Sequence, residues 1–404
     1  MDFNDTPEEA AFRQKARNWL AENAIPESEL EGDNLIHRHR PWLKRLYEGG
    51  WSCISWPKRY GGQGASPIQE VIWNQEQSHY PHLKTHRFSV GQKMVAPTLM
   101  EFLEDRPETL ERLLPPIASG DETWVQLFSE PAGGSDLAAL RTRAERDGDA
   151  WLVNGQKIWS SHAVEAKWGF IVTRTDPTVP KHKGLTCLYL DMENPGIEIR
   201  PIKQANGESE FNEVFFADVR IPDNQRVGQV GQGWEVAVTM LSHERLAMGG
   251  ENFGVDYEAL RKLAGEVCID GRPAIENAQV RAKLADFYCV EAGLRATTNR
   301  AISALSKGKN PGSETSINNM VIGASTQEIA AFALDLMEQA GIVLDESTQE
   351  SSFFQQAFLS IPSMRIAGGT DEIQANIVAE SVLGLPREPR VDKNVPFNEL
   401  PGGK

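Results

Sequence analysis

The sequence is poor in cysteine and lacks long hydrophobic runs. Its 404 residues include four cysteines, at positions 53, 187, 268 and 289, and these form no Cys-x-x-Cys pair of the kind that binds zinc. We therefore expect buried free thiols in a reducing cytoplasm, and no metal site. No segment approaches the roughly 18 uninterrupted apolar residues of a membrane span. The acidic N-terminus also lacks the basic start of a signal peptide. These absences predict a soluble cytoplasmic protein.

Positive charge is also scarce. Lys and Arg number 41 against 57 Asp and Glu, which gives a formal charge of −16. An acidic surface repels phosphodiester backbones, so nucleic-acid binding would need a local basic patch. The most basic stretch, His-Arg-His-Arg at residues 37–40, is short and is preceded by Glu31 and Asp33. The charge pattern therefore excludes nucleic acid as a partner.

Three regions differ in hydrophobic periodicity. Helical spacing dominates at first, and Thr6 followed by Pro7 and Glu9 is typical of a helix start. From about residue 123, short runs rich in β-branched and aromatic residues alternate with turn signals at residues 147–149 (Asp-Gly-Asp) and 154–155 (Asn-Gly). Helical spacing returns from about Trp234. The predicted helical segments include residues 42–48, 68–78, 108–117, 234–248, 276–306, 315–340 and 371–383.

This order predicts an α+β multidomain protein. We expect an N-terminal α-helical domain over residues 1–121 and a middle small antiparallel β-domain over residues 122–233. A C-terminal helical domain follows over residues 234–384. The proline-rich residues 385–404 are predicted to form a surface tail.

The helix that begins near Trp234 contains an unusual carboxylate. Ala237, Met240, Leu241 and Glu244 recur on one helical face, so Glu244 falls within the apolar stripe. A partly desolvated carboxylate is suited to act as a general base. On position alone, an ion pair with Arg245, His243 or a neighbouring subunit is the more common explanation.

Three other motifs can bind a ligand through backbone groups and small polar side chains. Residues 130–136 (Glu-Pro-Ala-Gly-Gly-Ser-Asp) offer N–H groups and a hydroxyl, although the same letters are ordinary in turns. Residues 159–161 (Trp-Ser-Ser) suit a stacking wall, but such a Trp is more often core. Residues 367–373 (Ala-Gly-Gly-Thr-Asp-Glu-Ile) predict a helix start capped by Thr370.

Taken together in chain order, these motifs resemble the acyl-CoA dehydrogenase family over almost the whole length. The matching stretches are residues 56–62, 128–136, 154–161, 213–222 and 368–374. The resemblance implies an N-terminal helical domain, a small β-domain and a C-terminal four-helix bundle, with FAD between the last two. It also implies an acyl-CoA substrate and electron transfer to an electron-transfer flavoprotein.

Carried over residue by residue, the resemblance implies a set of contacts. The expected FAD-binding residues are Leu127, Phe128, Ser129, Gly134, Ser135, Trp159, Ser160, Ser161, Ile366, Thr370 and Glu372 from one subunit, and Arg272, Met337 and Gly341 toward an adjacent one. The expected substrate-binding residues are Ser135, Ser242, Arg245, Gly368 and Gly369.

The catalytic base implied by the resemblance is Glu244. Many members carry the base directly before the Gly-Thr of the C-terminal motif, where this chain has Gly368, which has no side chain. Isovaleryl- and long-chain-type members supply a glutamate from the preceding helix in a Glu-Arg-Leu context, which Glu244 matches. The implied reaction is α,β-dehydrogenation to a trans-2-enoyl-CoA, with Glu244 taking the α-proton and the β-hydride passing to flavin N5.

Two departures from the family pattern leave alternatives open. The Arg-x-x-Phe-Gly segment that reaches a neighbouring FAD is replaced by Asp-Gly-Arg-Pro-Ala at residues 270–274, which leaves Arg272 as a candidate. Met337 stands where Gln is usual, although Gly341 is retained. The chain is accordingly expected to form a homotetramer, or a heterotetramer of two unlike subunits that acts on steroid side-chain or dicarboxylic acyl-CoA. An acyl-CoA oxidase-like enzyme and a non-catalytic scaffold subunit are further alternatives.

Overall fold

The chain divides into two compact units. The computed structural model describes residues 5–30, 35–248, 254–305, 307, 315–344, 352–390 and 392–401. The first unit contains Met1–Lys203, Ser209–Ala247 and Pro389–Lys404, and the second contains Gln204–Glu208 and Met248–Glu388.

Helices form the first part of the first unit. Thr6 caps α1 with a complete capping box, in which its side chain accepts from the Glu9 N–H and Glu9 accepts from the Thr6 N–H. Glu76, buried on α3, is bonded by Arg13 and Arg17 of α1 and so ties the two helices together. The helices are α1 (Pro7–Asn23), α2 (Leu35–Glu48), α3 (Pro67–Gln77), α4 (Ala96–Phe102) and α5 (Pro107–Ser119).

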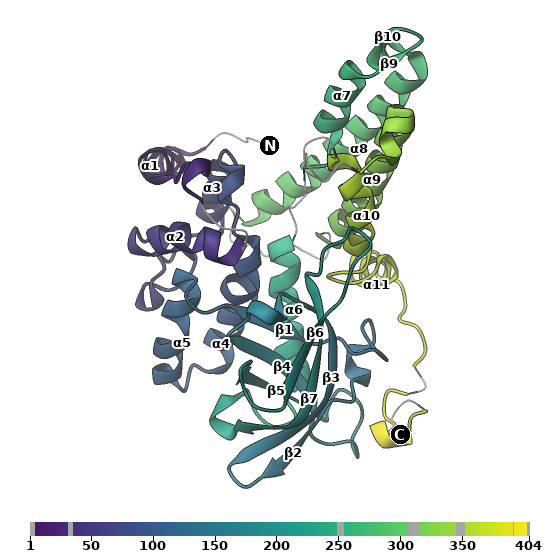
Figure 1. Cartoon of the computed structure of the whole chain (residues 1–404). Helices are drawn as coiled ribbons and strands as arrows, with labels where there is room; N and C mark the ends of the chain where they lie inside the picture. Colours follow the sequence, from purple (N-terminus) through teal and green to yellow (C-terminus); the bar gives the residue numbers. More distant parts are fainter. Residues whose placement is uncertain are drawn as a thin grey trace. The chain divides into compact units, whose positions relative to one another are not determined.

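An eight-stranded sheet completes this unit (Figure 1). Its order is β6-β7-β3-β2-β4-β5-β8, with β1 paired to β4. Most pairs are antiparallel as expected, but β1 runs parallel to β4 and β2 has one parallel pair with β4. Parallel neighbours need a long crossover, and the β2–β3 hairpin supplies it between β1 and β4. The strands are β1 (Trp124–Leu127), β2 (Arg143–Asp147), β3 (Ala150–Ser161), β4 (Trp168–Arg174), β5 (Leu185–Asp191), β6 (Ile197–Pro201), β7 (Phe211–Pro222) and β8 (Arg226–Val227).

The turn predicted at residues 154–155 is wrong. β3 continues through Gly155, and a register shift between Val153 and Gly155 marks a bulge opposite β7. Gly155 has φ 151°, and a Cβ there would lie 2.5 Å from the Thr142 hydroxyl. The glycine therefore allows a bulge and a close approach to Thr142. Glycine is common at such positions as well as in turns, so the residue type does not distinguish them. The turn predicted at residues 147–149 is confirmed, because it joins β2 to β3.

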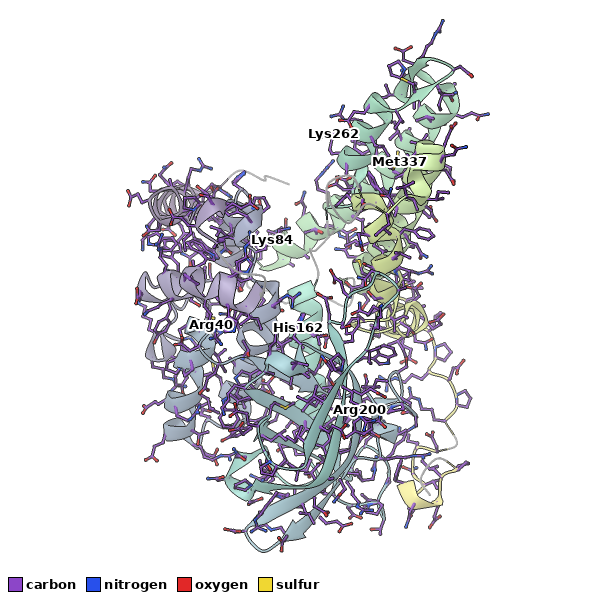
Figure 2. The ribbon with its side chains drawn as sticks, viewed as in Figure 1. Arg40, Lys84, His162, Arg200, Lys262 and Met337 are labelled. Atoms are coloured by element: carbon purple, nitrogen blue, oxygen red, sulfur yellow. The ribbon has the colours of Figure 1, made fainter. Side chains whose placement is uncertain are left out.

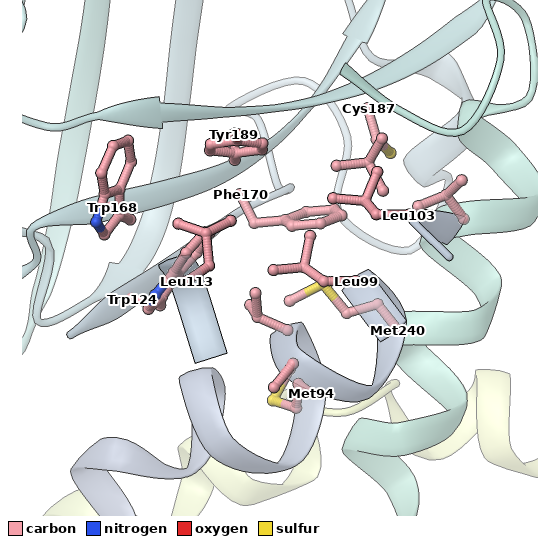
Figure 3. Packing of buried hydrophobic residues seen from close by; sticks show 14 of the residues in the cluster. Met94, Leu99, Leu103, Leu113, Trp124, Trp168, Phe170, Cys187, Tyr189 and Met240 are labelled. Carbon is pink, nitrogen blue, oxygen red and sulfur yellow. The ribbon is translucent and has the colours of Figure 1, made fainter. Parts of the chain in front are cut away.

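The core of the first unit places helix α6 (Gly233–Met248) against the sheet. Figure 3 shows Leu99 of α4, Trp124 of β1, Phe170 of β4 and Met240 of α6 in one buried cluster. Ala237 and Met240 are fully buried, as the helical stripe predicts. This packing fixes the helix that carries Glu244.

Helices also dominate the second unit. Their main contacts join α8 to α9 and α9 to α10 and α11 (Figure 1). The helical segments predicted at residues 315–340 and 371–383 are present, with the last continuing as a π-helix, Val378–Val382. The segment predicted at residues 276–306 is present as Ala278–Leu305, and residue 306 lies outside the described residues. The elements are α7 (Tyr257–Glu266), β9 (Cys268–Ile269), β10 (Arg272–Pro273), α8 (Ala278–Leu305), α9 (Thr315–Met337), α10 (Phe353–Ser360) and α11 (Asp371–Ile377).

One helical stretch is long and apolar. Ser316–Ile342 meets the length and composition of a membrane span, and 33% of its most apolar window is buried. The inner helix of a helical domain has the same composition, so this stretch alone is weak evidence for a membrane span.

Two sequence expectations change with the structure. All four cysteines are free, but Cys268 and Cys289 are exposed on the second unit, so the prediction of buried thiols is wrong for these two.

The C-terminal residues 385–390 are exposed, whereas Phe397 is only 3% exposed against the β4–β5 region. An apolar ring in a proline-rich tail gives no local signal of its burial.

Candidate active site

Glu244 lies on α6 and is half-buried beside β1. Its Oε2 accepts a hydrogen bond from the Gln126 Nε2 at 3.2 Å. The burial of Met240 one turn earlier and of Ala237 two turns earlier holds this part of α6 against the sheet. The carboxylate therefore meets a neutral donor from β1, the strand that pairs with β4. The side chain of Arg245, proposed as a partner or substrate contact, lies outside the described residues.

Ser242, two residues before Glu244, makes a helix-internal bond. Its hydroxyl donates to the Val238 carbonyl at 2.8 Å. Such a back-bond is common for serine within a helix and holds the hydroxyl against the backbone. The contact of Ser242 with acyl-CoA stays a prediction.

The loop that follows β1 exposes backbone rather than large side chains. Leu127 and Phe128 are buried in two separate cores, so their backbone is what they offer to a ligand. Beyond them, Gly134 and Ser135 are exposed. A tight turn joins these parts, because Glu130 and Gly133 exchange two backbone hydrogen bonds of 3.0 Å.

A buried ion pair holds the base of this loop. Lys157 is fully buried, and its Nζ donates to the Glu130 carboxylate at 2.8 Å and to the Phe128 carbonyl at 2.9 Å. The Glu130 carboxylate also accepts from the Arg141 and Thr142 N–H groups. Burial opposes the charge of Glu130, but Lys157 and these donors hold the pKa of Glu130 below its usual value. One carboxylate thus joins both ends of the loop.

Trp159 is an exposed aromatic residue in a strained backbone conformation. Its φ is +60°, in the left-handed region, at a register shift between Lys157 and Ser160. The indole is 56% exposed and lies edge-on to Phe211 at 6.1 Å. A bulky residue at positive φ is rare, and such strain concentrates at functional sites. The structure therefore favours the stacking-wall interpretation over a core role.

The two serines after Trp159 differ in their surroundings. Ser160 is 1% exposed, and its Oγ has no hydrogen-bond partner in the part of the chain that the structure describes. The Oδ1 atom of Asn212, whose amide donates to the Ser160 carbonyl, is likewise buried without a partner there. Ser161 ends β3 and pairs with Phe211. Buried polar atoms are normally satisfied, so this pair marks a place for a polar ligand or water.

The strand end beyond these serines is anchored by charge. His162, labelled in Figure 2, follows Ser161 at φ 57°. Its Nδ1 lies 2.9 Å from the Arg87 Nη1, and Arg87 also donates to Glu210 at 3.0 Å. This anchor fixes the end of β3 next to the residues of the stacking wall.

The second unit contributes the glycine-rich motif before α11. Gly368 and Gly369 have φ values of +68° and +106°, which favour glycine. The Gln374 side chain donates to the Gly368 carbonyl at 2.7 Å, and Thr370 caps α11 by accepting from the Ile373 N–H, as predicted. The φ of +106° at Gly369 disfavours any residue with a Cβ, so this position of the motif requires glycine.

Three predicted flavin contacts line one hollow in the second unit. Ile366, 67% exposed, lines it with Thr370 and Glu372 in a volume of about 310 Å³. Gln327, Pro362, Arg365 and Asp371 complete the lining. Arg365 forms an ion pair with Asp371 and donates to Gln327, so its charge is already compensated. Hydrogen bonds from its own backbone N–H and from Thr370 lower the pKa of Glu372.

The residues expected to reach a neighbouring subunit are spread over the second unit. Arg272 is exposed in the small β9–β10 hairpin. Met337 ends α9, where Figure 2 labels it, and packs against the core of this unit. Gly341 is buried, and a Cβ there would lie 2.4 Å from the Leu334 carbonyl oxygen. All three lie in the second unit, Arg272 in the hairpin and Met337 and Gly341 at the end of α9 or just after it.

The described residues of each unit fit a flavin. The first unit offers an exposed indole, unpartnered buried polar atoms at Ser160 and Asn212, and a loop with exposed glycine backbone and a serine hydroxyl. The second offers a hollow lined by an exposed Ile366 and the Thr370 and Glu372 side chains. Planar aromatic rings bind to such apolar surfaces flanked by a few polar groups.

Sequence reasoning missed Gln126, Lys157 and the groups that bond the Glu130 carboxylate at the base of the loop. Gln126 interrupts an apolar strand, Trp-Val-Gln-Leu, and a polar residue in a buried run is the signal that was available. Lys157 sits between Gln156 and Ile158 in a strand, where nothing local distinguishes a buried lysine from an exposed one.

Comparisons with known proteins match this organisation. Three family models cover the chain: acyl-CoA dehydrogenase, N-terminal domain, over residues 6–121; middle domain, over residues 126–219; and C-terminal domain, over residues 231–383. The acyl-CoA dehydrogenase IpdE1 of Mycobacterium tuberculosis is 35% identical over 390 residues, which cover 93% of this chain and 98% of that protein. FadE34 of the same organism is 39% identical over 344 residues, covering 85% of this chain and 46% of that longer protein.

Solved structures share the fold. The ChsE4–ChsE5 complex from Mycobacterium tuberculosis matches with a TM-score of 0.80 and 28% identity, over 96% of this chain and all of the compared chain. The Tcur3481–Tcur3483 steroid ACAD matches with a TM-score of 0.79 and 28% identity, with the same coverage. A glutaryl-CoA dehydrogenase from Mycobacterium smegmatis in complex with FADH2 matches with a TM-score of 0.74 at 17% identity, over 95% of this chain and 97% of that chain, which shows the fold alone.

Removal of Lys157 is expected to destabilise the β-sheet unit. In Lys157→Met the Glu130 carboxylate stays buried without its cation, which typically costs about 3–5 kcal/mol. Urea unfolding followed by tryptophan fluorescence measures the loss. Lys157→Met/Glu130→Gln should recover part of it, because the charge is removed and an acceptor oxygen remains. Lys167→Met, which breaks a half-exposed pair with Asp191 and Glu193, is the control and should cost less than about 1 kcal/mol.

The same pair sets a pH dependence. Because the pKa of Glu130 is lowered in the folded protein, its stabilisation is present above the ordinary carboxyl pKa of 4.5 and is lost as the pH falls through the lowered value. Below about pH 5, the free energy of unfolding of wild type should therefore fall more steeply than that of Lys157→Met/Glu130→Gln. If the free energy of unfolding fell equally steeply at acid pH in the two proteins, this assignment to Glu130 would be wrong.

Proposed function

Because the chain belongs to the acyl-CoA dehydrogenase family, we propose that it converts an acyl-CoA thioester to the trans-2-enoyl-CoA with Glu244 as the base. The enzymes of this family use FAD, which supplies the acceptor for the β-hydride and passes the electrons on to an electron-transfer flavoprotein. The observation that carries the proposal is the half-buried Glu244 carboxylate, fixed by the Gln126 amide at 3.2 Å. Gly368 leaves no side chain at the other position that the family uses for the base.

Glu244 takes the proton in this proposal. The α-carbon–hydrogen bond breaks, the proton moves to the carboxylate, and the electron pair forms the new carbon–carbon double bond as hydride leaves the β-carbon. The Gln126 amide donates to one carboxylate oxygen and restricts rotation of the group. A general base of this kind typically contributes about 10²–10⁴-fold to the rate.

The thioester requires a donor for its oxygen, which gains negative charge as the α-proton leaves. We assign this role to a backbone N–H near Gly368 and Gly369, where left-handed φ values expose the backbone. Such donors are worth about 3–4 kcal/mol. Ser135, Ser242 and Arg245 are assigned to the remainder of the acyl-CoA.

The cofactor would be held by residues of each unit. We assign Trp159, Ser160 and Ser161 to the isoalloxazine side, together with the backbone of Leu127, Phe128 and Ser129. Gly134 and Ser135 serve the pyrophosphate side. From the second unit we assign Ile366, Thr370 and Glu372, with Arg272, Met337 and Gly341 assigned toward a neighbouring subunit.

A heteromeric assembly is the second candidate. Two structures at 28% identity are described as a complex of two named proteins, ChsE4–ChsE5, and as a steroid ACAD of Tcur3481 and Tcur3483. Ile342, which ends the apolar stretch of the second unit, is 87% exposed in the single chain. The altered residues at 270–274 and Met337 fit a site completed by an unlike subunit. A substrate with a steroid side chain is suggested by the likeness to the Tcur3481–Tcur3483 steroid ACAD. Among the described residues all cysteines are free, which fits a reducing cytoplasm.

The variant Glu244→Gln tests the base. It should keep FAD but lose reduction of the flavin by acyl-CoA by about 10³-fold, because the amide has no lone pair basic enough to take the proton. Anaerobic stopped-flow absorbance at the flavin band measures the rate, with straight-chain, branched, dicarboxylic and steroid side-chain acyl-CoA thioesters. Glu235→Gln, an exposed carboxylate on the same helix, is the matched control and should be unchanged. Undiminished reduction in Glu244→Gln would remove Glu244 as the base.

The variant Gln126→Leu tests the positioning of that base. Loss of a hydrogen bond to a charged group is expected to lower kcat about tenfold. KM and FAD affinity should stay within about twofold, because Gln126 is not assigned to either ligand. Gln156→Leu breaks a comparable amide–carboxylate bond to Glu213, at 2.8 Å in the same sheet, and is the control. A change confined to KM would contradict the positioning role.

The assembly is tested by the FAD content of the chain expressed alone. A site completed by an unlike subunit should leave the purified chain with much less than one FAD per chain, and co-expression with a second acyl-CoA dehydrogenase-like chain should restore it. A full complement of FAD that is reduced by acyl-CoA would support the homotetramer instead. Reduced enzyme that reoxidises slowly in air is expected for a dehydrogenase, and rapid peroxide formation would indicate an oxidase.

A further inference from the structure

The C-terminal segment, residues 392–400, packs onto the loop between β4 and β5. The Phe397 N–H donates to the Val179 carbonyl and the Asn398 N–H to the Pro177 carbonyl, each at 3.0 Å. Pro180 and Pro396 form an isolated antiparallel bridge. This part of the chain belongs to the first unit, although the residues immediately before it, up to Glu388, belong to the second.

Arg174 connects this segment to the loop that follows β1. Its guanidinium donates to the Ala138 carbonyl at 2.6 Å, to the Leu140 carbonyl at 3.1 Å and to the Lys181 carbonyl at 3.2 Å. The Phe397 ring covers it, with the guanidinium carbon 3.6 Å from the ring centroid. The attraction between a cation and an aromatic face is stronger when the cation is desolvated than when it is exposed to water. The Phe397 ring therefore covers the face of a guanidinium group whose N–H groups donate to three carbonyls.

Lys181 makes a second connection of the same kind. Its Nζ lies 2.8 Å from an Asp136 carboxylate oxygen, next to Gly134 and Ser135, and 2.7 Å from Asp392. The lysine side chain is only 11% exposed, so these two carboxylates replace most of its water. One cation is thus shared between the exposed loop and the C-terminal segment.

We propose that residues 392–400 form a strap that positions the 129–142 loop for its ligand, acting through Arg174 and Lys181 as positioning residues. Glu130 and Lys157 fix the base of this loop from the inside, whereas the strap fixes residues 136–140 from the outside. The inference rests on the proposed assignment of Gly134 and Ser135 to FAD. It goes beyond that assignment by giving a function to a segment outside the residues that the family models match.

Two variants test the strap without shortening the chain. Asp392→Asn removes one carboxylate from Lys181, and Phe397→Leu removes the ring from Arg174 but keeps an apolar side chain. Asp149→Asn breaks an exposed ion pair with Arg220 in the same sheet and is the matched control. Each full-length protein is compared with wild type, with FAD removed and with FAD restored.

Hydrogen exchange of the FAD-free proteins is the first measurement. Peptides covering residues 130–142 should exchange about three- to tenfold faster in Asp392→Asn and Phe397→Leu, and at the wild-type rate in Asp149→Asn. The remaining sheet peptides should be unchanged. Equal exchange of residues 130–142 in all proteins, or a uniform increase over the whole sheet, would overturn the strap.

FAD titration is the second measurement. Both strap variants should bind FAD about three- to tenfold more weakly, and the control should match wild type. If the exchange changes but the FAD dissociation constant does not, the strap holds a loop that FAD does not use, and the positioning proposal is overturned. If wild type binds no FAD either alone or co-expressed with a second acyl-CoA dehydrogenase-like chain, the proposed function fails, while the exchange result still decides whether the segment holds the loop.

Discussion

The buried ion pair between Lys157 and Glu130 is the constraint on which the first unit depends. A lysine with no solvent exposure is tolerable only when its charge is matched, and here a carboxylate and the Phe128 carbonyl match it. The carboxylate also accepts from two N–H groups across the loop, at Arg141 and Thr142. The pair therefore closes the 129–142 loop at its base. The exposed Gly134 and Ser135 at the tip therefore extend from a fixed base.

The sequence allowed the helices and the alternating strand pattern to be predicted, because both depend on local periodicity. It also placed Glu244 in the apolar stripe that the buried Ala237 and Met240 confirm. The bulge at Gly155 was misassigned, since an Asn-Gly pair has the same composition in a turn and in a bulge. Contacts between residues far apart in the sequence could not be predicted from local patterns. No periodicity connects Gln126 to Glu244 or Phe397 to Arg174.

The exposed parts of the candidate site share a physical pattern. Trp159 and the Gly368–Gly369 pair all have positive φ, a conformation that costs free energy at Trp159 but is open to glycine. At Trp159 the conformation is enforced by the bulge opposite β7 and the anchored strand end at His162. At the glycine pair, the Gln374 side chain holds the backbone by donating to the Gly368 carbonyl. In each unit, therefore, rigid surroundings hold an exposed group in place, which is the requirement for binding a cofactor without reorganisation.

A single short stretch links the proposed base to the proposed flavin loop. Gln126 of β1 bonds Glu244, the Phe128 carbonyl two residues later bonds Lys157, and the Ser129 carbonyl accepts from the Ile158 N–H at 2.9 Å. Because Gln126 uses its side chain whereas Phe128 and Ser129 use their backbone carbonyls, this stretch contacts α6 and β3 at once. Any shift of β1 along its own axis would move the base and the loop together. The relative position of these two groups is therefore set by pairing of β1 with β4, whose side chains are buried throughout, rather than by the exposed loop itself.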